Sequence, residues 1–174
     1  MASIFGHGFV AYTIAKVVDS TSHRLLVGLA IGSAMLPDID VLAFSFGIDY
    51  HDPLGHRGFT HSILFAIIWS CILAFIFGKS RKLMFAVVLF LSTISHGLLD
   101  AMTTGGEGVG FLIPLDHSRY FFPLRPIKVS PIGIENFFSE WGVKVILSEL
   151  QFIILPCIIV LVVLYVFKKL NFKK

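Results

Sequence analysis

The stretch LMFAVVLFLSTISHGLLDAM, residues 83–102, establishes what class of protein this is. Its 20 mostly apolar residues would form a helix about 30 Å long, which equals the hydrocarbon thickness of a typical bilayer. The last turns contain His96 and Asp100, whose spacing of four places both side chains on one face of the helix. Ionisable groups at that depth are costly and usually functional. The stretch therefore predicts a transmembrane helix with a polar site near one end.

The rest of the chain extends this membrane assignment. Hydrophobic residues make up 56% of the 174 residues and the mean hydropathy is +0.86, whereas soluble domains are about 45–50% apolar. Apolar runs at 60–77 and 143–167 are long enough to span, and shorter runs at 4–18 and 25–36 predict a helical hairpin that is tilted or enters only partway. We therefore predict one all-α integral membrane domain, residues 1–174, with about five helical segments: three full spans and the shorter N-terminal hairpin.

The distribution of lysine and arginine predicts the orientation in the membrane. Nine of the 14 basic residues lie at 16–24, 78–82 and 168–174, which are expected at one end of the bundle, against five in the opposite loops. The N-terminus is then outside and the C-terminus cytoplasmic. The net charge of +3 is modest, and the basic residues form no stripe interleaved with aromatic residues, so we expect no nucleic-acid partner.

This topology brings seven potential metal ligands to the outer face of the membrane. They are His7, Asp38, Asp40, His56, His61, His96 and Asp100. Taken singly, several have plainer interpretations: the two aspartates at 38 and 40 could solvate a helix end, although in a turn or extended segment both could reach one ion. The convergence of all seven at one depth predicts a metal site at the outer membrane–water interface. Imidazole and carboxylate donors suit zinc, which we favour, or manganese or iron, as one or two ions.

Neighbouring arginines indicate the chemistry of the substrate. A bound metal polarises a phosphoryl oxygen and lowers the pKa of water to about 7, so such a site is naturally hydrolytic. Arg57 follows His56, and Arg125 lies in the outer loop; because a guanidinium matches phosphate in a bidentate manner, we predict both arginines as catalytic residues. The alternative is that such arginines anchor the loop to anionic headgroups. Thr60 is expected to cap the following helix. For Glu149 three roles remain open: a partner that supports the ligands from outside, a further ligand, or a neutral acid buried by packing.

The motifs LPDID (36–40), HRGFTHS (56–62) and SHGLLDAMTTGG (95–106) occur in an order that resembles the YdjM-like family, described as LexA-regulated, membrane-bound, metal-dependent hydrolases. The similarity runs from about Gly6 to Pro126 and contains every ligand candidate. The resemblance implies a bacterial inner-membrane protein with the seven residues in the metal-site positions, but no substrate. The spacing is also partly similar to zinc-dependent phospholipase C, although this chain lacks a clear downstream H-x-x-x-E.

Two classes of function follow from these patterns. The first is a membrane-bound, metal-dependent hydrolase that acts on a phosphoester, in a phospholipid or a lipid-linked phosphate that arrives laterally from the bilayer. The second is a non-catalytic site, in which the metal staples short helices together or is transported. A hydrolase of acyl esters or amides with the same metals would differ from the first only in substrate.

Overall fold

The computed structural model describes residues 1–19, 21, 23–131 and 138–171, and it confirms an all-helical chain. In this part of the chain there is no strand, only isolated bridges between Thr103 and Ile127 and between Val109 and Tyr120. The helices, with η for 3-10 and π segments, are α1 (Ile4–Val18), α2 (Arg24–Met35), η1 (Leu36–Phe46), η2 (Phe59–His61), α3 (Ile63–Phe77), η3 (Lys79–Arg81), α4 (Lys82–Ala101), α6 (Glu140–Glu149), η4 (Leu150–Ile154) and α7 (Leu155–Asn171).

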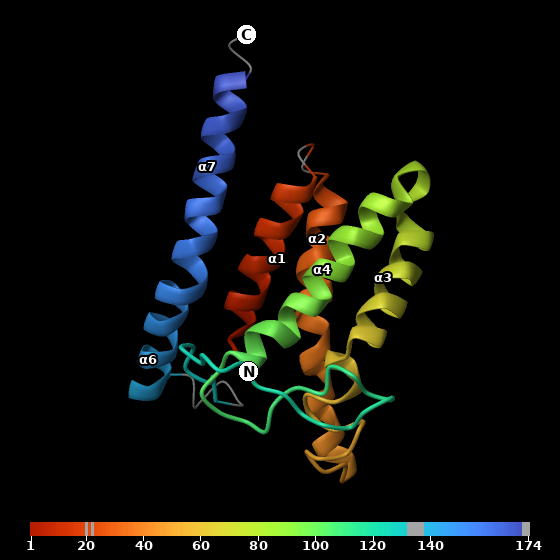
Figure 1. Ribbon diagram of the computed structural model, residues 1–174, viewed down its shortest axis with the longest axis vertical. Coiled ribbons are helices and arrows are strands. Elements are labelled where there is room, and N and C mark those ends of the chain that lie inside the picture. Colours follow the sequence, from red (N-terminus) through yellow and green to blue (C-terminus); the bar gives the residue numbers. More distant parts are fainter. Residues whose placement is uncertain (20, 22, 132–137, 172–174) are drawn as a thin grey trace.

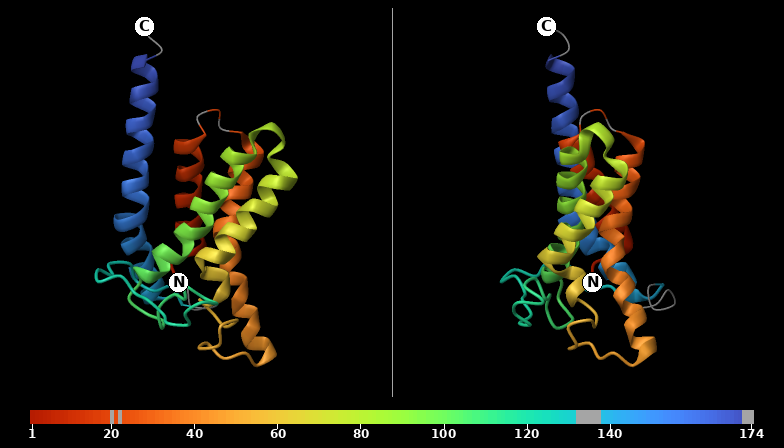
Figure 2. Two further views of the ribbon diagram at one scale, coloured as in Figure 1. Left: turned by 45° about the vertical axis from the view of Figure 1, so that its right-hand side comes forward. Right: turned by 90° about the vertical axis from the view of Figure 1, so that its right-hand side faces the viewer.

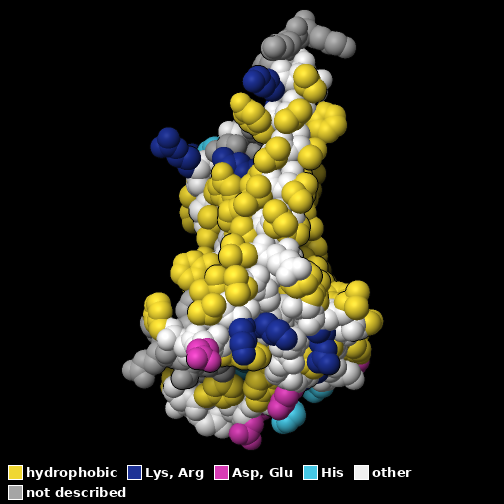
Figure 3. Space-filling model, turned by 90° about the vertical axis from the view of Figure 1, so that its left-hand side faces the viewer, with side chains coloured by type: hydrophobic (Ala, Val, Ile, Leu, Met, Phe, Trp, Pro, Cys, Tyr) yellow, Lys and Arg dark blue, Asp and Glu magenta, His cyan; other side chains and the backbone are white. Residues whose placement is uncertain are grey.

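Helices α1 to α4 form an up-and-down bundle, and α7 runs alongside α1 (Figures 1 and 2). Small residues of α1 and α2 allow close packing in the bundle, because Ala15 and Ala30 are fully buried against Val88 and Leu89 of α4. None of the residues of α7, Leu155–Asn171, is buried. Hydrophobic side chains cover the shaft of the molecule, whereas charged and histidine side chains gather near its ends (Figure 3). This pattern is that of a membrane-spanning bundle with polar ends.

In the described part of the chain, three helices are long and apolar enough to cross a membrane, as predicted. Those at 79–101 and 140–171 correspond to the predicted spans 83–102 and 143–167, but the third is at 24–46 and not at 60–77. The segment that follows residue 24 continues as η1 to Phe46, so that residues 24–46 form one of the long helices. Pro37 does not end it, because proline is tolerated in the first turn of η1. The apolar run at 60–77, which we predicted to span the membrane, forms a shorter helix than expected. Helix α3 begins at Ile63 and has 15 residues, about 22 Å of helix.

The start of α3 corrects a second expectation. Thr60 does not cap this helix; Ser62 does, and its hydroxyl accepts a hydrogen bond from the N–H of Phe65. The reason is that residues 59–61 form the separate turn η2, which moves the helix start by two residues and leaves the Thr60 hydroxyl free to bond elsewhere.

The final helix contains a break where proline predicts a kink. Pro156 has no N–H and its ring would clash with the carbonyl four residues earlier, that of Phe152. The structure adopts a π-helical segment at Leu150–Ile154 just before it, with the Leu155 N–H bonded to the Leu150 carbonyl. Such π segments are rare and often lie at functional sites. This one directly follows the buried carboxyl group of Glu149.

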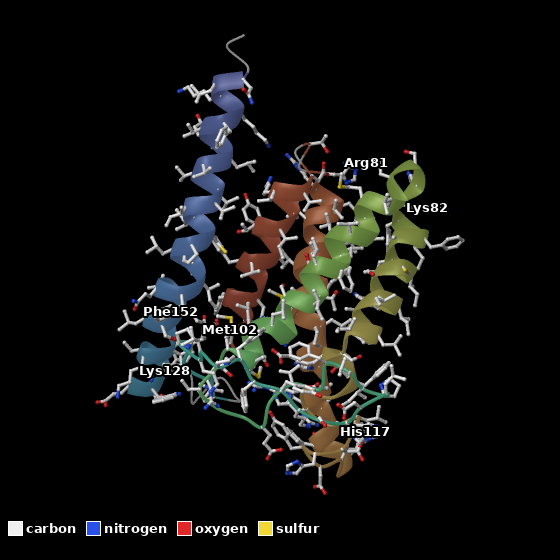
Figure 4. All side chains as sticks on the ribbon, viewed as in Figure 1. Arg81, Lys82, Met102, His117, Lys128 and Phe152 are labelled. Carbon is white, nitrogen blue, oxygen red and sulfur yellow. The ribbon has the colours of Figure 1, made fainter. Side chains whose placement is uncertain are left out.

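An ion pair joins the two turns at the end of the bundle that we predict to be cytoplasmic. Arg81, in the α3–α4 turn, donates from Nη2 to Asp19 Oδ1 at 2.7 Å and from Nη1 to the Thr21 hydroxyl at 3.1 Å. Figure 4 shows Arg81 at the opposite end of the molecule from Met102 and His117. Although burial of Asp19 opposes this, the hydrogen bonds from Arg81 and Thr21 hold the pKa of Asp19 well below its usual range.

We expect Asp19→Asn to destabilise the folded protein by about 1–3 kcal/mol near neutral pH, because Asp19 is buried and its partners would lose a charged acceptor. Since the pKa of Asp19 is lower in the folded than in the unfolded chain, the carboxylate stabilises the fold above the unfolded pKa of about 4, and this contribution is lost as the pH falls from there through the folded pKa. Thermal unfolding in detergent at several pH values checks this. The exposed Asp49→Asn is the control, and equal melting curves for the two variants at pH 7 would contradict the prediction.

Candidate metal centre

The helices bring the predicted ligands together at the end of the bundle opposite to Arg81. Helix α1 starts at this end and supplies His7, α2 continues into η1 with Asp38 and Asp40, and α4 ends there with His96 and Asp100. The connection between η1 and α3 adds His56 and His61 (Figure 1). The structure thus places all seven residues at one end of the bundle, and that this end faces outward stays a prediction.

Four of these seven residues form what we call the four-donor cluster: Asp38, His61, His96 and Asp100. Each offers one ligand atom, and these atoms all lie within 4.8 Å of one another. His96 Nε2 is 3.0 Å from His61 Nε2 and 3.2 Å from Asp38 Oδ1. His61 Nε2 is 3.8 Å from Asp100 Oδ2. Two imidazoles and two carboxylates around one point could bind a divalent metal, because this is the donor set and number that zinc takes.

The polar atoms of the cluster fit an ion. Asp38 Oδ1 and Asp100 Oδ2 are buried and have no hydrogen-bond partner among the described residues. Buried polar atoms are normally hydrogen-bonded. Although Arg57 Nε lies 3.0 Å from Asp100 Oδ2, the two carboxylates and two imidazoles of the cluster can take a further positively charged partner. The side chains of His61, His96 and Asp100 are 0% exposed, and that of Asp38 is 15% exposed. Any access to the cluster is therefore on the Asp38 side.

Hydrogen bonds on the far side of each imidazole orient both histidines. His96 donates from Nδ1 to the Ala34 carbonyl at 2.7 Å, and His61 Nδ1 lies 3.1 Å from Asp40 Oδ2. A proton on Nδ1 leaves the Nε2 lone pair of each ring free for a metal. Burial lowers the pKa of His61, which favours the neutral imidazole that metals require.

Asp40 organises the connection between η1 and α3 rather than pointing into the four-donor cluster. Its carboxylate accepts hydrogen bonds from His56 Nδ1 at 2.6 Å, the Thr60 hydroxyl at 2.6 Å and the Arg57 N–H at 3.1 Å. The structure thus places Asp40 and His56 one layer outside the four donors. Their role as direct ligands stays a prediction.

His7 lies beside the cluster. Its ring stacks on that of His96 with centroids 3.8 Å apart, and its Nε2 is 3.4 Å from Asp100 Oδ1. Both ring nitrogens are buried without a hydrogen-bond partner among the described residues. His7 is therefore placed to add a fifth donor through Nε2.

Arg57 is held against Asp100 and is fully buried. Its Nε lies 3.0 Å from Asp100 Oδ2, and its two terminal nitrogens donate to the Gly105 carbonyl and the Thr103 hydroxyl. Its backbone has a φ of 61°, in the left-handed region that is uncommon for residues other than glycine. The arginine that the sequence assigned to phosphate thus sits behind a ligand candidate and fixes its carboxylate.

The two other outer arginines have different surroundings. Arg125 is exposed and lies over the ring of Phe121 at 4.6 Å. No ion pair joins Arg125 to another residue in the described part of the chain. Arg119 binds backbone carbonyls instead, those of His56 at 2.8 Å and Tyr50 at 2.6 Å, so it shapes the loop before α3.

The sequence did not reveal two contacts of the N-terminal segment, one with Asp100 and one with Glu149. The Ala2 N–H donates to Asp100 Oδ1 at 2.8 Å, and the next residue, Ser3, donates from both its N–H and its hydroxyl to the carboxyl group of Glu149. Glu149 is therefore a partner of the N-terminal segment, through which α6 is tied to the cluster. The position of Glu149, two turns into an apolar helix, was the signal that the sequence offered. Its partner Ser3 could not be found from the sequence, because it lies 146 residues away.

We expect Asp40→Asn to weaken metal binding by about 10–100-fold, because Asp40 orients the ligand candidate His61 from outside the cluster. The measurement is a competition titration of zinc against a chelator with the detergent-purified protein. The control is Asp52→Asn, an exposed carboxylate in the same loop. Unchanged zinc affinity in Asp40→Asn would show that Asp40 does not orient His61.

Comparison with known proteins places these observations in context. The chain matches the family described as YdjM inner membrane protein over residues 1–172. It is 39% identical to a protein from Escherichia coli (strain K12) named inner membrane protein YbcI, with 80% of this chain and 91% of that protein covered. No solved structure matches the chain.

Proposed function

This chain belongs to the YdjM family of inner membrane proteins, and we propose from the geometry of its four-donor cluster that it is a metal-dependent hydrolase of phosphoesters. The observation that carries the proposal is the convergence of Asp38, His61, His96 and Asp100 within 4.8 Å, with two buried carboxylate oxygens that accept no hydrogen bond from the described residues. Such a donor set suits zinc, and manganese or iron less closely.

An ion held by these residues would polarise a phosphoryl oxygen and lower the pKa of water to about 7. The protein's own groups do the positioning. Arg57 and the Ala2 N–H hold the Asp100 carboxylate, while Asp40 and the Ala34 carbonyl keep Nε2 of His61 and His96 directed at the cluster. The arrangement is rigid, since each of these partners is buried. Preorganised groups of this kind lose little free energy to rearrangement during the reaction.

The substrate that we propose is a phospholipid or a lipid-linked phosphate. The cluster lies at one end of the apolar helices that form the shaft of the molecule (Figures 1 and 3). A substrate in the bilayer would approach this end of the bundle laterally. The exposed guanidinium of Arg125 is free to bind a phosphate at this end of the bundle. Because basic turns lie at the other end, we propose that the cluster faces outward, with the C-terminus in the cytoplasm.

The test is hydrolysis by the purified protein in mixed micelles. Zinc-, manganese- and iron-loaded samples are assayed with phosphatidylglycerol, phosphatidylethanolamine and bis(p-nitrophenyl) phosphate. We expect metal-dependent turnover that His61→Ala abolishes and that the exposed His51→Ala leaves unchanged. Absence of phosphoester hydrolysis from every metal-loaded sample would reject the enzyme.

A second candidate, a non-catalytic metal staple, is favoured by the burial of the cluster, because structural metal sites are closed. Removal of the metal separates the two. For the enzyme, a chelator should stop turnover while the α-helical circular dichroism remains. For the staple, the chelator should unfold the bundle, and no turnover should be seen before or after.

A further inference from the structure

A pocket of about 390 Å³ lies beside the four-donor cluster, between α3, α4 and the loop at residues 108–122. Its lining is apolar and includes Ile63, Ile94, Leu98, Phe111, Leu112 and Phe121. Its one hydroxyl, that of Tyr120, is bonded to Asp116. A pocket of this size matches ligand sites, but its side chains offer no group that would satisfy a polar ligand. Its occupant must be a hydrocarbon.

The pocket adjoins the cluster through Gly97, the residue after His96. A Cβ at Gly97 would lie 3.1 Å from both the His61 carbonyl and the ring of Phe111. Glycine is therefore needed here so that the Phe111 wall of the pocket can approach the backbone of α4. This close approach sets the pocket next to the ligand candidates His61 and His96.

The pocket has a direction relative to the membrane. Ile94 and Leu98 are one turn apart on α4, about 6 Å along its axis, and α4 is one of the helices long enough to span. Phe121, at the other side of the pocket, lies beyond the end of α4, because the Phe122 N–H bonds to the Ala101 carbonyl. The pocket thus extends from the membrane–water boundary towards the apolar interior.

A positively charged side chain, that of Arg125, lies where this pocket meets the membrane–water boundary. The Arg125 guanidinium lies 4.6 Å from the ring centre of Phe121, which lines the pocket. It is exposed, and no ion pair with an acidic residue occupies it among the described residues. A positive charge above an apolar slot complements a phosphate joined to a hydrocarbon chain.

We propose that this pocket binds one acyl chain of an anionic phospholipid whose phosphate lies on Arg125. The tail follows Leu98 and Ile94 into the bilayer, and the headgroup stays at the end of α4, beside the four-donor cluster. The inference deepens the proposed function and rests on it for the role of this lipid as substrate. Binding itself is measured without turnover, so the two can fail separately.

The experiment is native mass spectrometry of the full-length protein released from detergent after titration with chain-matched phosphatidylglycerol and phosphatidylethanolamine. Leu98→Trp fills the pocket. Ile72→Trp is the control, because Ile72 has a similar exposed fraction, 46% against 39% for Leu98, and lies nine residues after Ile63 on α3, on the face of that helix opposite to the pocket. Leu112→Trp fills the pocket from the loop and carries the test if Leu98→Trp does not fold. Arg125→Gln removes the charge.

We expect Leu98→Trp and Leu112→Trp to retain about tenfold less phosphatidylglycerol than the wild type, since several methylene groups lose their burial, while Ile72→Trp binds normally. Arg125→Gln should lose about fivefold of the preference for phosphatidylglycerol over phosphatidylethanolamine. Wild-type retention of phosphatidylglycerol in Leu98→Trp and Leu112→Trp, or an unchanged preference in Arg125→Gln, would overturn the proposal. Zinc content is measured in the same samples: normal zinc without hydrolysis in a lipid-binding wild type rejects the hydrolase and leaves the lipid site standing.

Discussion

Replacing His96 and Asp100 together by alanine should remove bound metal and lower phosphoester turnover more than about 10³-fold, because a catalytic metal supplies several kcal/mol of charge stabilisation. These residues are two of the four converging donors, and both are fully buried. The readouts are zinc per protein by elemental analysis and initial rates on the phospholipid panel. The double variant His51→Ala, Asp52→Ala removes the same residue types from an exposed loop and should behave as the wild type.

The alanine pair also removes two structural contacts, since Asp100 accepts from Ala2 and His96 donates to Ala34. His96→Gln with Asp100→Asn keeps polar side chains of similar size and should fold, but it supplies only weak, uncharged metal donors. Loss of metal and turnover in this folded variant would show that the effect comes from the missing metal ligands and not from the lost structural contacts. If both alanine and conservative variants keep wild-type metal content, these residues are not ligands.

Arg57→Gln should cost about 3–5 kcal/mol of folding stability, because it leaves the buried carboxylate of Asp100 without its guanidinium partner. The guanidinium also donates to the Thr103 hydroxyl and the Gly105 carbonyl, both of which would lose this donor. Thermal unfolding in detergent measures this. Arg125→Gln, an arginine that is exposed, should change stability by less than about 0.5 kcal/mol.

Arg57→Lys distinguishes charge from shape at the same position. A lysine keeps the positive charge but has no planar fork to reach three acceptors at once, so it should recover only part of the stability. Full stability in Arg57→Gln would mean that Asp100 is neutralised by something other than Arg57, and the positioning role of this arginine would be wrong.

The membrane helices were largely predictable because long apolar runs have few other uses. The location of the site was predictable for the same reason: each ionisable group stood at the end of such a run, and alternation of helix direction places those ends together. The exact bounds of the membrane-spanning helices were less predictable. The apolar run at 25–36 predicted a short segment that ends before Pro37, yet proline is tolerated at the start of η1, and residues 24–46 form one long helix.

The spacing in the sequence did not predict which of the seven residues face the four-donor cluster and which lie outside it. From the sequence, we expected Asp38 and Asp40 to reach one ion together only if they lay in a turn or an extended segment. They lie instead in the 3-10 helix η1, where three residues make a turn and positions two apart point about 120° away from each other. Asp38 therefore faces His96, while Asp40 faces His56.

Arg57 shows the same limit of sequence-based inference. Its place beside His56 indicated a phosphate contact, but its actual partners, Thr103 and Gly105, are more than 40 residues away in the sequence. Only the closed loop before α3, with Arg57 in a left-handed conformation, brings the guanidinium behind Asp100. Long-range pairing of buried charges depends on tertiary packing that no local pattern records.

The most direct test of the central claim is metal-edge X-ray absorption on the protein purified from zinc-supplemented cells. We predict about one zinc or more per chain, with mixed imidazole and carboxylate donors at about 2.0–2.2 Å, and loss of this spectrum in the His96→Gln, Asp100→Asn variant. A wild-type protein that retains no metal, or one whose ion shows no imidazole ligand, would contradict the proposed four-donor cluster.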